Sequence, residues 1–183
     1  PKSNTEKEQQ RSIFLIDQWC SEYENKINNL GGIGFFLGGI GPDGHIAFNV
    51  RGSDHNSTTR LMETNFETQA AAATDLGGIE ISKNRLVITI GLGTITTNKN
   101  AVAIITAAGE AKATIVKKSL ENAPDVIYPA SVLQTLKNSR FYLTKGAGKH
   151  LKDVENIYWK NAEWSESKKQ RALLQLAHSS NTF

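Results

Sequence analysis

A short apolar run between glycines, residues 33–37 (Ile-Gly-Phe-Phe-Leu), constrains the fold more than any other segment of the chain. Strands that are buried on both faces have such continuous apolar runs, and they occur in parallel sheets covered by helices. Three further strands are predicted at residues 85–90, 101–106 and 140–143. Segments with helical periodicity separate these strands, so the chain is predicted to be an α/β sandwich with a mainly parallel sheet.

The helical segments are recognised by apolar residues that recur every three or four positions. Residues 11–30 are the longest such segment, and the apolar face is formed by Ile13, Ile16, Cys20, Tyr23, Ile27 and Leu30. Residues 1–9 are polar and are expected to be frayed. Further helices are expected at residues 67–75, 109–120, 131–137, 150–160 and 165–177.

The 183 residues suffice for one domain with a sizeable buried core. We expect residues 1–160 to form the α/β domain and residues 161–183 to be a carboxyl-terminal extension. The apolar face of helix 165–177 fits two interpretations. The helix packs on the same domain, or it is a linker towards a further domain.

Composition excludes several classes of function. Lys plus Arg total 21 and Asp plus Glu total 18, a bias too weak to indicate nucleic-acid binding. No apolar run approaches membrane-spanning length, so no membrane partner is predicted. Cys20 is the single cysteine, which rules out an intramolecular disulfide and favours a small buried residue. A reducing compartment, and hence a cytoplasmic location, is the expectation.

The predicted strand 33–37 leads into a long loop, residues 38 to about 60, that carries Asp43 and His45 among glycines. Ligands of open α/β sheets bind at the carboxyl ends of the strands, and glycines allow a ligand to approach the backbone. His45 is suited to proton transfer near neutral pH, with Asp43 to orient it. The alternative is a tight turn in which Asp43 caps backbone N–H groups. No His or Cys cluster lies nearby, so no metal site is predicted.

The string Gly-Ile-Gly-Pro-Asp-Gly-His-Ile-Ala-Phe-Asn, residues 39–49, closely resembles the signature of the glucosamine-6-phosphate deaminase/isomerase family. Four other segments resemble that family in the same order, namely residues 57–60, 88–95, 109–113 and 129–134. The family converts glucosamine 6-phosphate to fructose 6-phosphate and ammonia without a metal or organic cofactor. The resemblance implies a three-layer, Rossmann-like sandwich and a sugar-phosphate ligand of the glucosamine 6-phosphate class.

By this resemblance, His45 opens the sugar ring by moving a proton between O5 and O1, and Asp43 assists it. The substrate-binding residues that the resemblance implies are Gly39, Gly41, Gly44 and Lys112. Lys112 also stands near the start of a predicted helix, where free N–H groups and the helix dipole attract phosphate. The alternative for Lys112 is an exposed lysine on a helix.

The sequence departs from the family pattern in three respects. Val50 occupies the position of a glutamate that pairs with the histidine, and Thr74 occupies that of a phosphate-binding arginine. The family chain also begins well before this one, with a phosphate loop and the aspartate that moves the C2 proton. We therefore expect a divergent or truncated carboxyl-terminal part that lacks the amino-terminal portion and is inactive as a deaminase by itself. A homo-oligomer or a missing amino-terminal segment would complete it.

Three functions compete. The first is aldose–ketose isomerisation with deamination of an amino-sugar phosphate. The second is a non-catalytic domain that binds a sugar phosphate, which Val50 and the absent arginine favour. The third is a 6-phosphogluconolactonase-like hydrolase, which shares the fold and an Asp-Gly-His loop. The loop of that enzyme usually continues with a Thr-Ala-Ser type of sequence, whereas residues 46–49 here are Ile-Ala-Phe-Asn.

Overall fold

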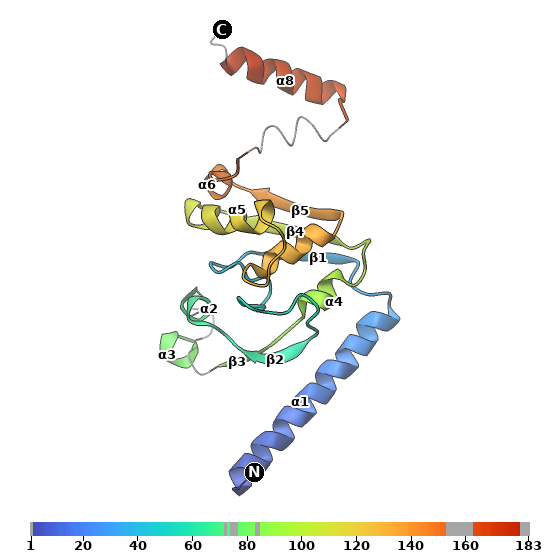
Figure 1. The fold of residues 1–183 in the computed structure, drawn as a ribbon, viewed down its shortest axis with the longest axis vertical. Helices are drawn as coiled ribbons and strands as arrows, with labels where there is room; N and C mark the ends of the chain where they lie inside the picture. Colours follow the sequence, from blue (N-terminus) through green and yellow to red (C-terminus); the bar gives the residue numbers. More distant parts are fainter. Residues whose placement is uncertain (1, 72, 74–76, 83–84, 153–162, 180–183) are drawn as a thin grey trace. The chain divides into compact units, whose positions relative to one another are not determined.

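The structure is a computed structural model that describes residues 2–71, 73, 77–82, 85–152 and 163–179. The chain divides into two compact units, Pro1–Leu151 and Lys152–Phe183, and each is considered by itself (Figure 1). The first unit contains both sheets and the loop that carries Asp43 and His45.

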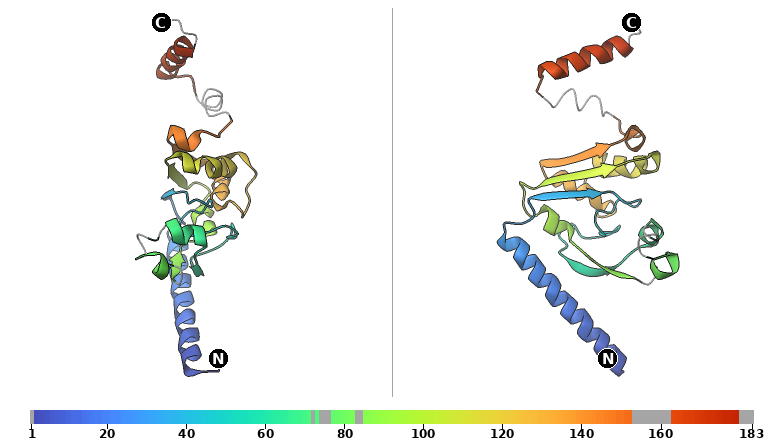
Figure 2. Two further views of the ribbon diagram at one scale, coloured as in Figure 1. Left: turned by 90° about the vertical axis from the view of Figure 1, so that its left-hand side faces the viewer. Right: turned by 180° about the vertical axis from the view of Figure 1, so that it is seen from behind.

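A three-stranded parallel sheet is the centre of the first unit. It consists of β1 (Phe35–Gly39), β4 (Val102–Ala107) and β5 (Asn138–Leu143), in the order β1-β4-β5. Figure 2 shows the three strands side by side and pointing the same way. All three carboxyl ends therefore lie at one edge of the sheet. The predicted α/β class with a mainly parallel sheet is confirmed, and three of the four predicted strands belong to this sheet.

One face of the sheet forms the core. Alternate residues of β4, namely Ala103, Ile105 and Ala107, are buried and belong to a cluster with residues of α4 (Leu92–Thr96), α5 (Ala113–Glu121) and η2 (Pro129–Thr135). On the other face, Phe35, Leu37 and Tyr142 keep 59%, 61% and 59% of their surface exposed. The described helices of this unit therefore cover the sheet unequally, and burial is concentrated on the α5 side.

The fourth predicted strand lies outside this sheet. β3 (Leu86–Thr89) pairs antiparallel with β2 (Arg60–Glu63), and together they form a separate two-stranded sheet. The prediction that residues 85–90 belong to the parallel sheet is therefore wrong, and β2 was not predicted. An alternating β-branched pattern identifies a strand but not its partner, and β2 is only four residues long.

The first helix begins earlier than its apolar pattern indicates. α1 spans Asn4–Asn29, and a capping box between Ser3 and Glu6 starts it, so the expectation that residues 1–9 are frayed is wrong from Asn4 onward. Cys20 is buried as predicted, and burial raises the pKa of its thiol, with Asp17 and Glu24 adding to the effect. Much of the predicted apolar face of this helix remains exposed, and its buried residues are Cys20, Glu24 and Ile27.

The remaining helices of the first unit are short. The predicted helix 67–75 corresponds to α2 (Phe66–Ala71), and the predicted helix 109–120 begins as a 3-10 turn, η1 (Glu110–Lys112), that continues as α5. The predicted helix 131–137 is instead the 3-10 helix η2, which starts at a proline. α3 (Ile79–Ser82) and α6 (Lys145–Gly148) were not predicted, because four residues give no readable period.

The second unit contains α8 (Glu166–Ser179), which confirms the helix predicted at residues 165–177. Residues 153–162 lie outside the described part of the chain, and so does most of the predicted helix 150–160. The domain boundary at residue 160 therefore stays a prediction. Among the helices that the structure describes, none combines the length and the apolar character that crossing a membrane requires.

Candidate active site

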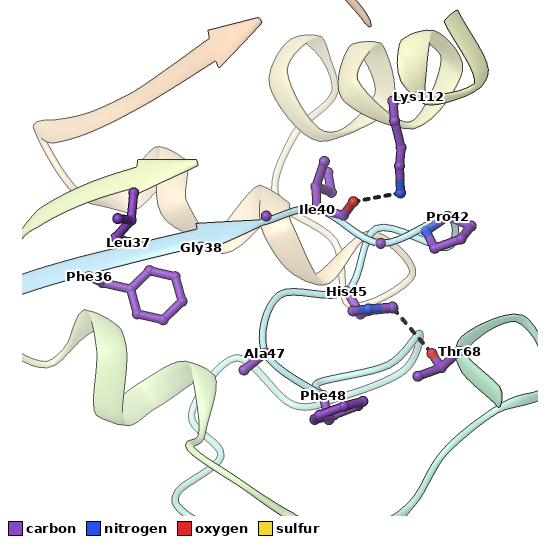
Figure 3. Close-up of a pocket in the computed structure, with 12 residues that line it drawn as sticks. Phe36, Leu37, Gly38, Ile40, Pro42, His45, Ala47, Phe48, Thr68 and Lys112 are labelled. Atoms are coloured by element: carbon purple, nitrogen blue, oxygen red, sulfur yellow. Dashed lines mark hydrogen bonds between the residues drawn. The ribbon is translucent and has the colours of Figure 1, made fainter. Parts of the chain in front are cut away.

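A cavity of about 480 Å³ opens at the carboxyl end of β1, where the Asp43–His45 loop begins (Figure 3). Its position agrees with the crevice expected at the strand ends of an α/β sheet. Residues from β1, the following loop, α2 and η1 line it: Phe36, Leu37, Gly38, Gly39, Ile40, Gly41, Pro42, His45, Ala47, Phe48, Thr68 and Lys112.

Asp43 is a buried carboxylate with a full set of donors. Its Oδ1 lies 2.5 Å from Nδ1 of His45, and its Oδ2 accepts from the backbone N of Arg51 at 3.1 Å and from Nδ2 of Asn65 at 2.7 Å. Burial by itself would raise the pKa of Asp43, but the hydrogen bonds from His45, Asn65 and Arg51 outweigh it and hold that pKa well below its usual range. Asp43 is therefore an anion that orients its neighbour.

The orientation of His45 follows from this contact. A carboxylate can only accept, so Nδ1 of the neutral imidazole carries the proton and Nε2 keeps its lone pair. The loop closes on itself around the ring, because Gly41 N donates to the carbonyl of His45 at 2.9 Å and Gly44 N donates to the carbonyl of Gly41 at 3.1 Å. The ring lines the cavity, so the arrangement presents a base to a ligand there.

The predicted glycines have different surroundings. Gly39 and Gly41 line the cavity, whereas Gly44 is absent from its lining. A Cβ at Gly41 would lie 2.0 Å from the His45 ring, so no larger residue fits there without moving the imidazole. Gly44 has a φ of +88°, and its carbonyl accepts from Ala130 N at 2.8 Å, which ties the loop to η2. Its substrate-binding role stays a prediction.

Lys112 lines the same cavity as His45 from the other side of the loop. It ends η1, and its Nζ donates to the carbonyl of Ile40 at 2.8 Å, as Figure 3 shows. Burial lowers the pKa of the Lys112 ammonium from its ordinary value, and the charge of Asp43 opposes this shift. The structure thus brings together Lys112, His45 and two of the three predicted glycines.

Two residues of the site were missed by the sequence analysis. Asn65 donates to Asp43, and Thr68, which is buried, has its Oγ1 3.2 Å from Nδ1 of His45. An available signal was the Asn-x-x-Thr spacing at the start of α2, where the Asn65 side chain accepts from Thr68 N.

The departures at positions 50 and 74 have different outcomes. Val50 lies in the loop and offers no hydrogen-bonding side-chain atom, while Thr74 lies outside the described residues. Asn49 holds the loop in place: its amide donates to the carbonyls of Ile46 and Ile90, and its Oδ1 accepts from Arg60.

Within the described ranges, no three His, Cys, Asp or Glu side chains gather where they could hold a metal ion.

No family model matches the chain. Curated relatives include the glucosamine-6-phosphate isomerase of Candida albicans, 40% identical over 124 residues that cover 67% of this chain and 50% of that protein. The glucosamine-6-phosphate deaminase of Borrelia hermsii is 35% identical over 150 residues, which cover 78% of this chain and 55% of that protein. This chain therefore spans about half the length of the curated relatives it matches.

Solved structures show the same relationship. A monomeric glucosamine-6-phosphate deaminase has a TM-score of 0.67 and 30% identity, over 73% of this chain and 54% of that one. The 6-phosphogluconolactonase from Trypanosoma cruzi has a TM-score of 0.53 at 21% identity over 72% of this chain and 50% of that one, so it shares the fold alone. Over the two thirds or more of its length that align with these relatives, the chain belongs to the glucosamine-6-phosphate deaminase/isomerase family.

Proposed function

We propose that this chain carries the ring-opening and phosphate-binding groups of a protein that acts on glucosamine 6-phosphate or a closely similar amino-sugar phosphate. One observation carries the proposal: His45, which is held by Asp43, and Lys112 line a single cavity at the end of β1. Relatives at 35–40% identity act on this class of substrate by name, which supports the same class here.

Ring opening needs one group that both takes and returns a proton. In the proposed step, Nε2 of His45 removes the proton from the O1 hydroxyl while the C1–O5 bond breaks and C1=O1 forms. The same imidazole then protonates O5, which becomes the free hydroxyl of the open chain. Asp43 accepts from Nδ1 at 2.5 Å, so its carboxylate faces the positive charge that the imidazolium carries during this step.

The phosphate is assigned to Lys112. Its ammonium has three donors, and one of them is used by the carbonyl of Ile40. The remaining donors can reach a phosphate in the cavity, and a charge-assisted hydrogen bond contributes about 1.5–3 kcal/mol. Gly39 and Gly41, which line the same cavity, are proposed to let the sugar lie close to the backbone.

Isomerisation and deamination also need a base at C2. No carboxylate is among the described residues that line the cavity. We therefore propose that the 183-residue chain by itself opens the ring but does not release ammonia. The complete reaction would require a missing amino-terminal segment or a second copy of the chain. A cytoplasmic location, without nucleic-acid or membrane partners, is proposed on the sequence grounds given above.

Calorimetric titration with glucosamine 6-phosphate, paired with an ammonia assay, tests the proposal. Weak binding without ammonia release is expected. Lys112→Ala should lower the affinity about tenfold or more. Lys118→Ala should leave it unchanged, because Lys118, on α5, lies over the ring of Tyr128 and is not among the residues that line the cavity. Equal affinity of wild type and Lys112→Ala would overturn the phosphate assignment. Ammonia release would show that a base at C2 is present.

A non-catalytic sugar-phosphate sensor is the second candidate, and Val50 favours it because this position offers no partner to His45. The two candidates differ in one result. If the chain is a sensor, the wild type and His45→Gln bind the sugar phosphate with the same affinity and neither opens the ring. If the chain is part of an enzyme as proposed, the wild type opens the ring. A hydrolase of the 6-phosphogluconolactonase kind is a third candidate, and likeness at 21% identity supports its fold only.

A further inference from the structure

The Asn65 side chain joins helix α2 to Asp43. Its Nδ2 donates to Oδ2 of Asp43 at 2.7 Å, and its Oδ1 accepts from the backbone N of Thr68 at 3.0 Å. A carboxylate can only accept and a backbone N–H can only donate, so the two contacts fix which end of the amide faces which partner. An amide is the only side chain of this size and shape that satisfies both.

Thr68 connects the same helix to His45. Its Oγ1 lies 3.2 Å from Nδ1 of His45, and the residue is 1% exposed. The Nδ1 proton already points to Oδ1 of Asp43, so the threonine oxygen acts as a second acceptor for that proton. Asn65, directly before α2, and Thr68, in its first turn, therefore contact both members of the carboxylate–imidazole pair. Figure 3 shows the contact of Thr68 with His45.

We propose that Asn65 and Thr68 are positioning residues that fix the Asp43 carboxylate and, through it, the Nδ1–H tautomer of His45. Neither residue touches the reacting atoms in this proposal. Its meaning for catalysis rests on the proposed ring-opening role of His45, but the tautomer itself is a property of the chain without ligand.

The need for this support follows from what Asp43 would lose. Without the Asn65 amide, Arg51 N is the one donor to Oδ2 that remains among the described residues, and the carboxylate can rotate away from the ring. Position 50 supplies no replacement, because valine has no hydrogen-bonding side-chain atom. The free imidazole prefers no single tautomer strongly, so the hydrogen bond at Nδ1 decides which nitrogen is available as the base.

Asn65→Asp separates positioning from helix capping. Aspartate caps a helix as well as asparagine does, so the start of α2 is retained. The new carboxylate cannot donate to Asp43 and repels it instead. Asn98→Asp is the matched control, because the Asn98 side chain also accepts from a nearby backbone N, that of Asn100, but does not line the cavity. Thr68→Val replaces the hydroxyl by a methyl group of similar size, and Thr68→Ser retains the hydroxyl.

Long-range ¹H–¹⁵N NMR of the imidazole rings in the 183-residue chain measures the tautomer without any ligand. His45 is assigned among the four histidines with His45→Gln. Wild type, Asn98→Asp and Thr68→Ser should show the Nδ1–H form. In Asn65→Asp the share of the Nδ1–H form should fall by about half or more, and in Thr68→Val the share of this form should fall as well.

A wild-type tautomer pattern in folded Asn65→Asp would overturn the proposal. If circular dichroism shows that this variant is unfolded, Asn65→Gly decides the question, because glycine is also tolerated at the start of a helix and has no side chain that could donate to Asp43. Failure of the proposed function gives a different result. In that case the tautomers change as expected, while calorimetry detects no binding of glucosamine 6-phosphate to the wild type.

Discussion

At the scale of single residues, Asp43 and His45 show how a short motif becomes a site. The sequence predicted both residues and their orienting contact, because they stand in a glycine-rich turn after a predicted strand and within a string that resembles the family signature. It did not reveal Asn65 or Thr68, which come from a helix about twenty residues later. Contacts of that kind depend on how the loop folds back, and the Asn-x-x-Thr capping pattern marks only the start of α2, not its contact with the loop.

Asp43→Asn should make the chain less stable at neutral pH by about 2–3 kcal/mol, because the carboxylate is buried with several donors. The lowered pKa of Asp43 sets the pH dependence. A group with a lowered pKa in the folded state stabilises the fold above its unfolded pKa, near 3.8, and loses this contribution as the pH falls through its folded value. Urea unfolding between pH 2 and 7 measures both.

The wild type should therefore lose stability below about pH 4 more steeply than Asp43→Asn does, so that the two unfolding curves approach each other in acid. A constant difference between the two proteins across this range would mean that the carboxylate is not held as an anion in the folded chain.

Gly41→Ala should displace the His45 ring, since a Cβ at this position would lie 2.0 Å from the imidazole. Overpacking of this kind costs about 1–3 kcal/mol, and the His45 signals in the NMR spectrum should move. Gly34→Ala is the control, because nothing lies within 4 Å of the position its Cβ would take. An unchanged His45 environment in Gly41→Ala would show that the loop adapts without involving the ring.

At the scale of elements, the prediction succeeded where burial dictates the pattern. The parallel strands are recognisable because strands that pack in a helix-covered parallel sheet consist of consecutive apolar residues. β2 and α1 show the limits. β2 consists of Arg-Leu-Met-Glu, which has little strand character, and its pairing with β3 is a long-range choice. The start of α1 depends on a capping box, which outweighs the polar composition of the first residues.

Glu24 links α1 to two other elements and carries a test of that helix. Its Oε1 accepts from Thr59 N at 2.8 Å and from the Thr94 hydroxyl at 2.6 Å, and all three residues are buried. Glu24→Ala should lower the free energy of unfolding by about 1–3 kcal/mol, because two buried donors lose their partner. The exposed Glu22 is on the same helix, and Glu22→Ala should change stability by less than about 0.5 kcal/mol.

Thermal unfolding followed by circular dichroism compares the two variants. Equal stability of Glu24→Ala and Glu22→Ala would mean that α1 is held by its apolar contacts alone, through Cys20 and Ile27.

At the scale of the whole molecule, the chain presents part of a family fold. It spans about half the length of its curated relatives, and one face of its parallel sheet exposes Phe35, Leu37 and Tyr142. Parallel sheets are usually covered on both faces, and the sequence analysis predicted such a sheet, whereas the described helices cover it only on the α5 side. The site at the end of β1 is nevertheless assembled within the first unit. Ring opening can therefore be tested apart from the complete reaction.

The interconversion of the α and β anomers of glucosamine 6-phosphate tests the central claim most directly, because it passes through the open chain and needs no base at C2. Exchange NMR at millimolar substrate, in a buffer without phosphate, measures its rate. We expect the wild-type chain to make interconversion faster than in buffer alone, and we expect His45→Gln to leave it at the buffer rate. With Lys112→Ala the rate should be intermediate. A wild-type rate equal to that of His45→Gln would rule out ring opening by His45.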